Sequence, residues 1–478
     1  MSCGFVFSAA SAYLRVLCGN DHFNAEDAEI RRGPQRKTSY SDLSEGELLA
    51  TTSEKLLEDL QEARHRTLQL VEDLDDEQMI GPRLATVNPL RWEIGHVAWF
   101  QEYWLLRHLC GRSPILPDGD ALYDSAKVAH DTRWDLTLPQ KSDTIAYMLR
   151  TLDDAKQYIG TRVSSVADET EYFLSLALFH EDMHGEAITY SRQTLGYPPP
   201  QLNQSKHRSQ TEAVDPIASS DAFIPGGSFL MGNTAEEGFV FDNEKQPFQV
   251  GVQPFAISRT ATTNAEYLTF VDDAGYKRRE LWSTDGWQWR EHVGANHPVY
   301  WRFEGGEWWR RNFDELVRLE ANLPVLHVNW YEADAYCRWA GRRLPTEAEW
   351  EMAASTDPGS NRKLKFPWGN DTPTTSQANL DSHAMGCVAV DALPGGDGAH
   401  GCRQMIGNTW EWTSTDFLPY PGFVAGPYKE YSAPWFGNHK VLRGGCWATR
   451  SRLIHNTYRN FYTPDRRDVW AGFRTCAL

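Results

Sequence analysis

Apolar residues between positions 45 and 195 recur every three or four residues, which is the spacing of an amphipathic helix. Pro89 suits the first turn of one such stretch, and Gly196 followed by Pro198 suits the end of another. The pattern predicts four long helices, over residues 45–74, 89–111, 142–163 and 169–195. Long helices joined in this way favour a helical bundle.

The hydrophobic pattern changes after residue 196. A polar stretch nearly free of large apolar side chains comes first, and it predicts a linker. Beyond it, short β-like runs alternate with Gly, Pro and Asn, and helical stretches occur near 264–274 and 330–340. These features predict an irregular α+β domain. The expected organisation is an extension, a bundle, a linker and the α+β domain, over residues 1–44, 45–196, 197–221 and 222–478.

Length, charge and cysteine usage narrow the classes of function. A chain of 478 residues is long enough for more than one core. Its 65 acidic residues outnumber 47 basic ones, and a formal charge of −18 argues against nucleic acid or an anionic membrane as a partner. The eight cysteines include no CxxC pair, as expected of reduced thiols in the cytoplasm. No apolar run approaches the roughly 20 residues of a membrane span.

Two histidines in the fourth predicted helix have the spacing of a metal-ligand pair. His180 and His184 are four residues apart, so both imidazoles lie on one helix face. His96 stands within the apolar second helix, beside Gly95, which leaves room for a close approach. A lone histidine in such a stripe is more often a core residue than a ligand. If the inward faces of two bundle helices meet, however, His96 completes a three-histidine site that would leave Fe2+ open positions.

The same histidine pair also fits the HExxH signature of zinc proteases, with Glu181 as the general base. The metzincin form of that signature needs Gly and His where Ala187 and Tyr190 stand. Zinc proteolysis is therefore a distant alternative.

Five motifs of the second domain carry a family resemblance. They are IPGGSFLMG (224–232), RLPTEAEWE (343–351), FPWGN (366–370), GNTWEW (407–412) and LRGGCW (442–447). With these motifs, the chain from about residue 45 to 478 resembles the sulfoxide synthases of the ergothioneine pathway, including relatives that make selenoneine. The resemblance implies a DinB-like four-helix bundle followed by a C-type-lectin-related domain like the formylglycine-generating enzymes.

Most of these motifs also suit a purely structural role, with turn glycines and packed indoles, and a fold does not by itself assign a function. A true formylglycine-generating enzyme would carry a cysteine pair after Gly445. Residues 448–473 contain no cysteine, and Cys446 and Cys476 are 30 positions apart. Oxidation of protein cysteine is therefore disfavoured.

The resemblance implies roles for individual residues. His96, His180 and His184 take the family's iron-ligand positions. Tyr428, in the segment 428–432 that resembles the family's tyrosine pair, becomes the candidate proton donor, and Tyr431 is the second, substrate-binding tyrosine.

The segment 458–464 resembles the part of the family that holds trimethylhistidine. Asn460 can hydrogen-bond the polar end of this substrate. Phe461 can face its quaternary ammonium, which has charge but no N–H donor and therefore suits an aromatic wall. Tyr462, Arg133 and Met183 are the further substrate contacts that the resemblance implies.

Three features depart from the enzymes that use γ-glutamylcysteine. Met183 stands where those enzymes have Gln, and Tyr462 stands where they have an Asp that receives the donor's ammonium. Only Arg133, with His130 near the second position, matches a pair of carboxylate-binding arginines. A neutral, hydroxyl-rich donor fits this set better than a dicarboxylate amine. We therefore expect a selenosugar donor, with cysteine or γ-glutamylcysteine as the alternative.

The expected reaction joins selenium or sulfur to the imidazole carbon of trimethylhistidine and consumes O2. The partners are these small molecules, with no nucleic acid and no membrane. The resemblance implies Fe(II) as the cofactor and leaves a Ca2+ ion in the second domain as an open expectation.

Overall fold

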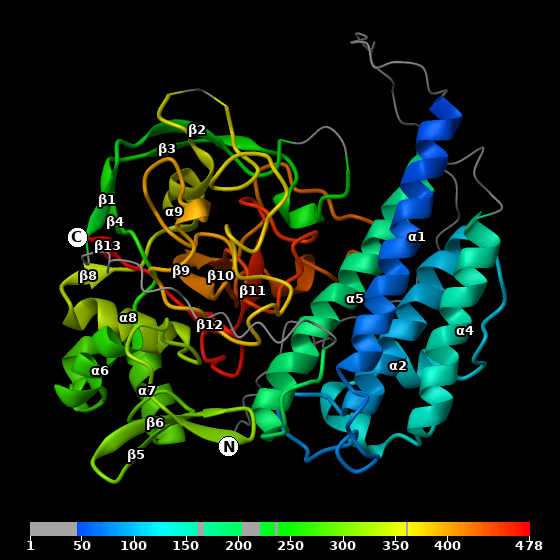
Figure 1. Ribbon diagram of the computed structural model, residues 1–478, viewed down its shortest axis with the longest axis horizontal. Coiled ribbons are helices and arrows are strands. Elements are labelled where there is room, and N and C mark those ends of the chain that lie inside the picture. The colour runs from blue at the N-terminus through cyan, green and yellow to red at the C-terminus, as the bar shows by residue number, and fades with distance from the viewer. Residues whose placement is uncertain (1–44, 161–166, 203–219, 235–237, 360–361) are drawn as a thin grey trace.

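The structure is a computed structural model that describes residues 45–160, 167–202, 220–234, 238–359 and 362–478. Figure 1 shows a bundle of long helices beside a larger region of short strands, helices and loops. The predicted extension and most of the predicted linker lie outside the described residues. None of the described helices has both the length and the apolar character that a membrane span requires.

Four long helices form the described part of the bundle, as the hydrophobic spacing predicts. α1 packs on α5, and α2 packs on α4. α2 continues without a break into a π-helical segment, η1, which still lies within the predicted range. The elements are α1 (Glu45–Gln69), α2 (Leu90–Gln101), η1 (Glu102–Leu109), α3 (Gly119–Tyr123), η2 (His130–Asp135), α4 (Lys141–Gly160) and α5 (Ala167–Leu195).

The first helix is shorter than predicted. It ends at Gln69 rather than at residue 74, because the chain turns there while its apolar residues stay buried. The Lys141 ammonium donates to three carbonyls of this turn, those of Val71, Glu72 and Leu74. Helical spacing in the sequence therefore runs past the end of the helix, since a buried turn can keep the same apolar pattern.

The second region is an irregular α+β fold, as predicted. Its helices are α6 (Asn264–Asp272), α7 (Thr284–Val293), α8 (Trp330–Trp339) and α9 (Glu347–Ser355), with 3-10 turns η3 (Asp242–Glu244), η4 (Gly275–Lys277), η5 (Arg279–Leu281), η6 (Pro394–Gly396) and η7 (Ala433–Trp435). Its strands are β1 (Asp221–Ile224), β2 (Gly227–Met231), β3 (Phe248–Val252), β4 (Phe255–Ser258), β5 (Trp301–Glu304), β6 (Glu307–Asn312), β7 (Glu315–Arg318), β8 (Arg342–Arg343), β9 (Trp410–Asp416), β10 (Lys440–Arg443), β11 (Asn460–Tyr462), β12 (Ala471–Gly472) and β13 (Cys476–Ala477).

The strands form small sheets, of which the one ordered β11-β10-β9-β12 matters most for the site. β10 pairs antiparallel with both neighbours, so that Leu442 lies opposite Asn460 on one side and Trp412 on the other. β12 runs parallel to β9, with Ala471 beside Trp410. One sheet therefore holds the segments 410–416 and 460–462 in a fixed register.

The sequence motifs of this region act mainly as scaffold, as expected. In the 343–351 motif, Thr346 caps α9 and forms a capping box with Glu349, which also binds Arg343 through two hydrogen bonds of 2.7 and 2.8 Å. Glu351 accepts from the Gly232 backbone at 2.8 Å and from the guanidinium of Arg443. One buried carboxylate thus joins three of the five motifs.

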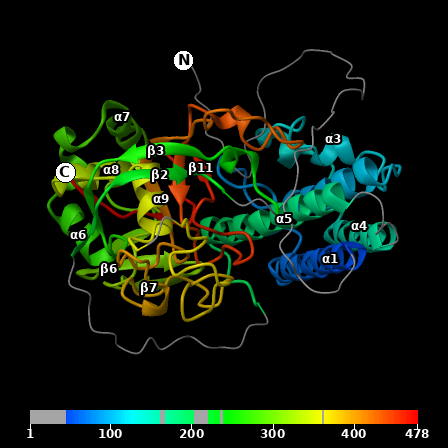
Figure 2. The same ribbon diagram turned by 90° about the horizontal axis from the view of Figure 1, so that it is seen from above.

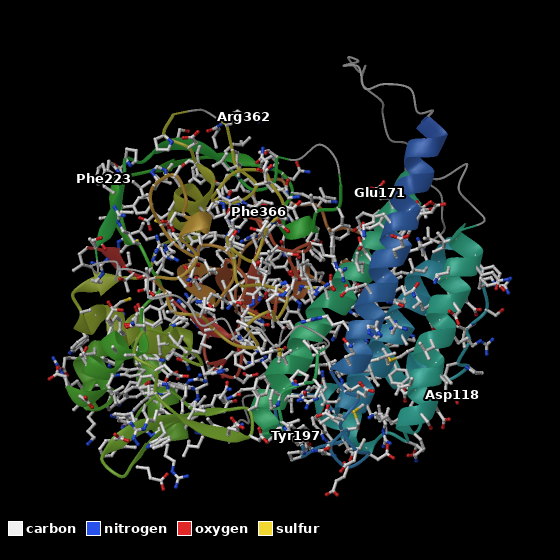
Figure 3. The ribbon with its side chains drawn as sticks, in the orientation of Figure 1. Asp118, Glu171, Tyr197, Phe223, Arg362 and Phe366 are labelled. Carbon is white, nitrogen blue, oxygen red and sulfur yellow. The ribbon has the colours of Figure 1, made fainter. Side chains whose placement is uncertain are left out.

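The α5 helix lies between the other bundle helices and the α+β region (Figures 1 and 2). Side chains from both regions meet along it (Figure 3). Four polar residues of α5, which we call the docking stripe, recur every three or four positions: Asp182, Glu186, Thr189 and Gln193. They bind, in that order, Arg452, Trp410, Trp470 and the Arg311 carbonyl, at 2.7, 2.7, 2.8 and 3.0 Å.

Candidate metal centre and substrate cavity

His96, His180 and His184 meet inside the bundle, where α2 faces α5. All three are buried, and one nitrogen from each ring lies within 4.8 Å of the others. The Nε2 atoms of His180 and His184 are 3.2 Å apart. In the described part of the chain, this is the one group of three or more His, Cys, Asp or Glu side chains close enough to share an ion. The expected Ca2+ ion stays a prediction.

Hydrogen bonds orient two of the three rings. His96 donates from Nδ1 to the Tyr123 carbonyl at 2.8 Å, and His184 donates from Nδ1 to Glu93 at 2.5 Å. These bonds place the proton on Nδ1 and leave the Nε2 lone pair for a ligand or ion. Burial lowers the pKa of both His96 and His180 well below its ordinary value. Neutral imidazoles are the form that binds a metal, so the residues present fit a divalent cation.

Gly95 allows the contact between His96 and the chain segment at Tyr123. A Cβ atom at position 95 would overlap the Tyr123 ring and lie 2.7 Å from its hydroxyl oxygen. The absent side chain therefore brings the Tyr123 carbonyl within reach of the His96 ring.

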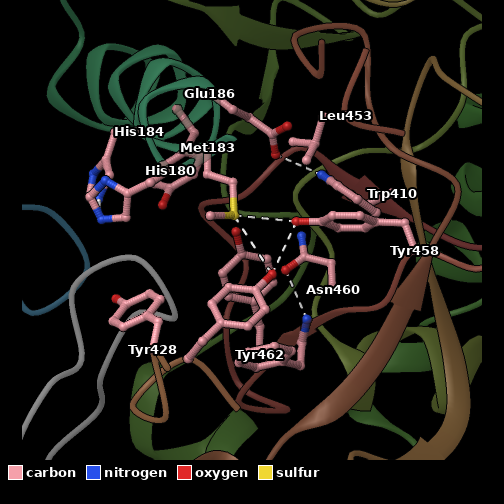
Figure 4. A pocket seen from close by; sticks show the side chains of 13 residues that line it. His180, Met183, His184, Glu186, Trp410, Tyr428, Leu453, Tyr458, Asn460 and Tyr462 are labelled. Atoms are coloured by element: carbon pink, nitrogen blue, oxygen red, sulfur yellow. Dashed lines mark hydrogen bonds between the residues drawn. The ribbon is translucent and has the colours of Figure 1, made fainter. Parts of the chain in front are cut away.

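A cavity of about 60 Å3 lies beside the histidines, between α5 and the α+β region (Figure 4). One wall comes from α5, and loops and strands of the second region form the other walls. The lining residues are His180, Met183, His184, Glu186, Tyr190, Trp410, Tyr428, Tyr431, Leu453, Tyr458, Asn460, Phe461 and Tyr462. The cavity thus brings together the sequence-predicted site residues of both regions, with two exceptions, His96 and Arg133.

Tyr428 stands at the histidine end of the cavity. Its ring centre is 5.0 Å from that of Phe100 and 6.2 Å from that of His180. Phe100 in turn stacks on His180, with ring centres 3.6 Å apart and nearly parallel planes. The phenol of Tyr428, the candidate proton donor, is therefore half-buried and lies close to the histidine cluster.

Met183 occupies the middle of the cavity (Figure 4). Its sulfur accepts hydrogen bonds from the hydroxyls of Tyr458 at 3.3 Å and Tyr431 at 3.7 Å. The two hydroxyls also lie 3.2 Å from each other. Burial raises the pKa of both phenols well above the ordinary value, so they remain neutral hydrogen-bond donors.

Asn460, Phe461 and Tyr462 line the opposite side of the cavity from strand β11. Phe461 is buried and stacks on Phe417, with ring centres 4.0 Å apart. Burial raises the pKa of Tyr462 well above its ordinary value, and the Arg466 guanidinium lies 5.1 Å from the centre of its ring. That guanidinium is paired with Asp468 through two hydrogen bonds of 2.6 Å.

Arg133 lies outside the cavity, although the sequence predicts it as a substrate contact. It is fully buried in the bundle, where it donates to Asn88 at 2.6 Å and covers the Trp92 ring at 3.6 Å. The neighbouring His130 is also buried and bonds to the Val87 carbonyl at 2.7 Å. Both residues are therefore buried, and neither lines the cavity.

Glu181, the general base of the protease alternative, does not line the cavity either. Its carboxylate accepts from Arg64 at 2.9 and 3.2 Å and from the Gln101 amide, all within the bundle core. A carboxylate that is held in a buried ion pair and does not line the cavity cannot activate water there.

Sequence reasoning missed five lining residues: Glu186, Tyr190, Trp410, Leu453 and Tyr458. Glu186 and Tyr190 follow Met183 at spacings of three and four, so a helical projection would place the three on one face. Glu186 accepts from Trp410 at 2.7 Å and from Thr449, and burial raises its pKa. Trp410 lies within the GNTWEW motif, one of the motifs that also suit a purely structural role.

Comparisons with known proteins agree with this architecture. Residues 59–188 match the DinB superfamily, and residues 207–477 match the sulfatase-modifying factor enzyme 1-like domain. The hercynine oxygenase of Mycolicibacterium smegmatis is 36% identical over 430 residues, which cover 88% of this chain and 98% of that protein. The hercynine oxygenase of Mycobacterium tuberculosis is 35% identical over 442 residues, covering 89% and 99%.

A more distant likeness covers only the second region. The formylglycine-generating enzyme of Streptomyces coelicolor is 33% identical over 300 residues, which cover 53% of this chain and 87% of that protein. The expected fold class is therefore confirmed, with a DinB-like helical region followed by an α+β domain like the formylglycine-generating enzymes.

Proposed function

The chain belongs to the hercynine oxygenase family, where hercynine is trimethylhistidine. We propose that it uses Fe(II) and O2 to join the selenium or sulfur of a small donor to the imidazole carbon of hercynine. In balanced form, hercynine, the selenol or thiol donor and O2 would give the selenoxide or sulfoxide and one water. The imidazole C–H bond and the Se–H or S–H bond break, a C–Se or C–S bond forms, one oxygen atom of O2 is bound to the selenium or sulfur, and the other leaves as water with the two hydrogens. The observation that carries the proposal is a buried cluster of three histidines beside a cavity with an aromatic lining.

The three histidines would hold the metal. His96 and His184 offer Nε2 lone pairs fixed by hydrogen bonds at Nδ1, and a ligand set of neutral imidazoles preserves the full +2 charge of Fe2+. Iron bound there would supply the redox chemistry with O2, which the side chains of the cavity cannot supply.

The side chains around the cavity would hold and orient the substrates. Asn460 can donate to the carboxylate of hercynine, and Phe461 can face its trimethylammonium group. Tyr428, close to the histidine cluster, is positioned to give a proton to reduced oxygen. Tyrosines on both sides of the cavity would help to exclude bulk water from the reacting groups.

The charge of the lining supports a neutral donor. Among the described residues that line the cavity there is no lysine or arginine, and the one carboxyl, that of Glu186, already accepts hydrogen bonds from Trp410 and Thr449. Arg133, the expected partner of a donor carboxylate, is bonded to Asn88 instead. Hydroxyls of Tyr431, Tyr458 and Tyr462 can hydrogen-bond a sugar, and their rings can pack against its face. We therefore favour a selenosugar over γ-glutamylcysteine or cysteine, which remain the alternative donors.

Anaerobic reconstitution with Fe2+, followed by O2, tests the proposal. Hercynine would be offered together with a selenosugar, cysteine or γ-glutamylcysteine in separate reactions, and the products would be identified by mass spectrometry. We expect an O2-dependent product from the selenosugar with the highest kcat/KM, and loss of bound iron and of turnover in His96→Ala. Turnover without O2, or full iron and activity in His96→Ala, would exclude the proposed chemistry. A preference for γ-glutamylcysteine would remove only the selenosugar assignment.

A further inference from the structure

A chain of hydrogen bonds runs from Arg133 to the histidine cluster. The guanidinium of Arg133 donates to the Asn88 amide oxygen at 2.6 Å. The Asn88 amide nitrogen donates to one oxygen of Glu93, and the other oxygen of Glu93 accepts the Nδ1 proton of His184 at 2.5 Å. Three successive hydrogen bonds therefore connect a cation to a ring that faces the proposed metal.

A second line of contacts connects Arg133 to His96. Its guanidinium lies 3.6 Å from the centre of the Trp92 ring. Trp92 stacks on His96, with ring centres 4.9 Å apart and planes that differ by 7°. The Trp92 indole donates to the Leu122 carbonyl at 2.7 Å, next to the Tyr123 carbonyl that accepts from His96. The guanidinium of Arg133 thus contacts groups that in turn contact His184 and His96.

All the groups in these contacts are buried, so the charged ones are costly to keep in the core. Arg133 and Trp92 are 0% exposed, and Asn88 and Glu93 are 3% exposed. Burying a guanidinium and a carboxylate is expensive, and apolar residues of similar volume would often stabilise a core as well or better. A buried charged chain is therefore weak evidence for stability. Its geometry, with both ends defined by hydrogen bonds, is that of groups that orient metal ligands.

From these contacts we infer that Arg133 is a positioning residue of the metal site, which holds Glu93 and His184 through Asn88 and holds His96 through Trp92. This inference rests on the proposed function, because it assumes that the three histidines bind a metal ion. It replaces the expected contact of Arg133 with a substrate carboxylate, since the side chain is fully buried on Asn88 and Trp92 and does not line the cavity.

Metal affinity is the direct readout. Co2+ serves as the probe, because its visible absorption reports ligand geometry as well as binding, and competition with a chelator gives the affinity. We expect Arg133→Met to weaken Co2+ binding by about 10-fold or more, within the 10- to 100-fold range of groups that orient metal ligands, and to alter the absorption band. Glu93→Gln should weaken binding at least as much. The combined variant should lose less than the product of the two single losses, because both act on His184.

Arg192→Met is the matched control. Arg192 is also 0% exposed and is bonded to the Asp73 carboxylate at 2.7 and 2.8 Å, but it lies on α5 about 12 Å beyond His184. We expect this variant to lose thermal stability and to keep the wild-type affinity and spectrum. If Arg133→Met does not fold, as judged by circular dichroism, Asn88→Ala interrupts the same chain while leaving the guanidinium on Trp92 and takes its place.

The outcomes separate the inference from the proposed function. Wild-type protein that binds no Co2+, or binds it undiminished after His180→Ala, would refute the metal site itself. A wild type that binds Co2+ through the histidines, with Arg133→Met indistinguishable from Arg192→Met, would refute only the role of Arg133. A raised donor KM in Arg133→Met with unchanged metal affinity would restore the substrate contact and equally overturn the inference.

Discussion

Replacing Gly95 by alanine should destabilise the bundle, although the same replacement at an unobstructed helix position is favourable. Within a helix, alanine is better than glycine by about 0.5–1 kcal/mol, because glycine loses more backbone freedom on folding. Position 95 has no room for this gain. A Cβ there would overlap ring carbons of Tyr123, which is itself buried at 0% exposure.

The two effects differ enough in size to give a definite sign. Overpacking of a close-packed core typically costs about 1–3 kcal/mol. The overlap with a ring carbon of Tyr123 puts this position at the upper end of that range, about 2–3 kcal/mol. Set against a helix-propensity gain of about 0.5–1 kcal/mol, Gly95→Ala should lower the free energy of unfolding by about 1–2.5 kcal/mol. It should also weaken metal binding, because displacement of Tyr123 moves the carbonyl that accepts from His96.

Gly185, one residue after His184, provides the matched control. A Cβ at this position would meet Leu70 at 3.6 Å, which is ordinary van der Waals contact. Gly185→Ala should therefore be neutral or stabilise the protein by up to about 1 kcal/mol. Urea unfolding followed by circular dichroism, together with Co2+ titration, measures both variants. The reasoning is refuted if Gly95→Ala is as stable as Gly185→Ala and binds metal as well as the wild type.

Three further predictions concern the cavity. Phe461→Leu keeps apolar volume against Phe417 but removes the aromatic ring. Steady-state kinetics should then show the hercynine KM rising about 2- to 30-fold, which corresponds to a cation–π interaction of about 0.5–2 kcal/mol, with a smaller change in the donor KM. Equal effects on both substrates would contradict this contact. Tyr462→Asp should narrow the preference for a selenosugar over γ-glutamylcysteine, measured as a ratio of kcat/KM, because a carboxylate can bind an amine; an unchanged ratio would remove Tyr462 from the donor site. Tyr428→Phe should lower kcat by about 10²-fold or more with unchanged Co2+ affinity, if its hydroxyl delivers a proton; an unaffected kcat would remove that role.

The fold could be predicted well where one pattern has one structural meaning. Apolar spacing placed the long helices within a few residues, but it could not reveal that the second helix becomes π-helical after Gln101. A π-helical segment of eight residues is too short for its i→i+5 period to be distinguished in a hydrophobic pattern. The end of α1 was missed for a related reason, because the buried turn at Leu70 and Val71 repeats the helical spacing.

The site could be predicted only in part, because it forms between distant segments. The spacing of His180 and His184 is visible in the sequence, whereas His96 is a single histidine whose partners are 84 and more positions away and needed a family resemblance to be assigned. Arg133 shows the limit of such an assignment. A matching position does not reveal what a buried side chain contacts, and here the guanidinium is bonded to Asn88 and lies over the Trp92 ring.

The docking stripe also bears on how the reactive centre is shielded. α5 presents the two histidines to the bundle and, a quarter-turn or more away, binds Trp410, Trp470 and Arg452 of the other domain. Neither half of the chain encloses the cavity alone, since one supplies Met183 and the other supplies Tyr431 and Tyr458. If the bundle held Fe2+ without the α+β region beside it, the metal would be open to solvent. O2 could then be reduced there without forming the C–Se or C–S bond. Coupling of oxygen consumption to bond formation would thus depend on two domains staying closed around a single shared helix.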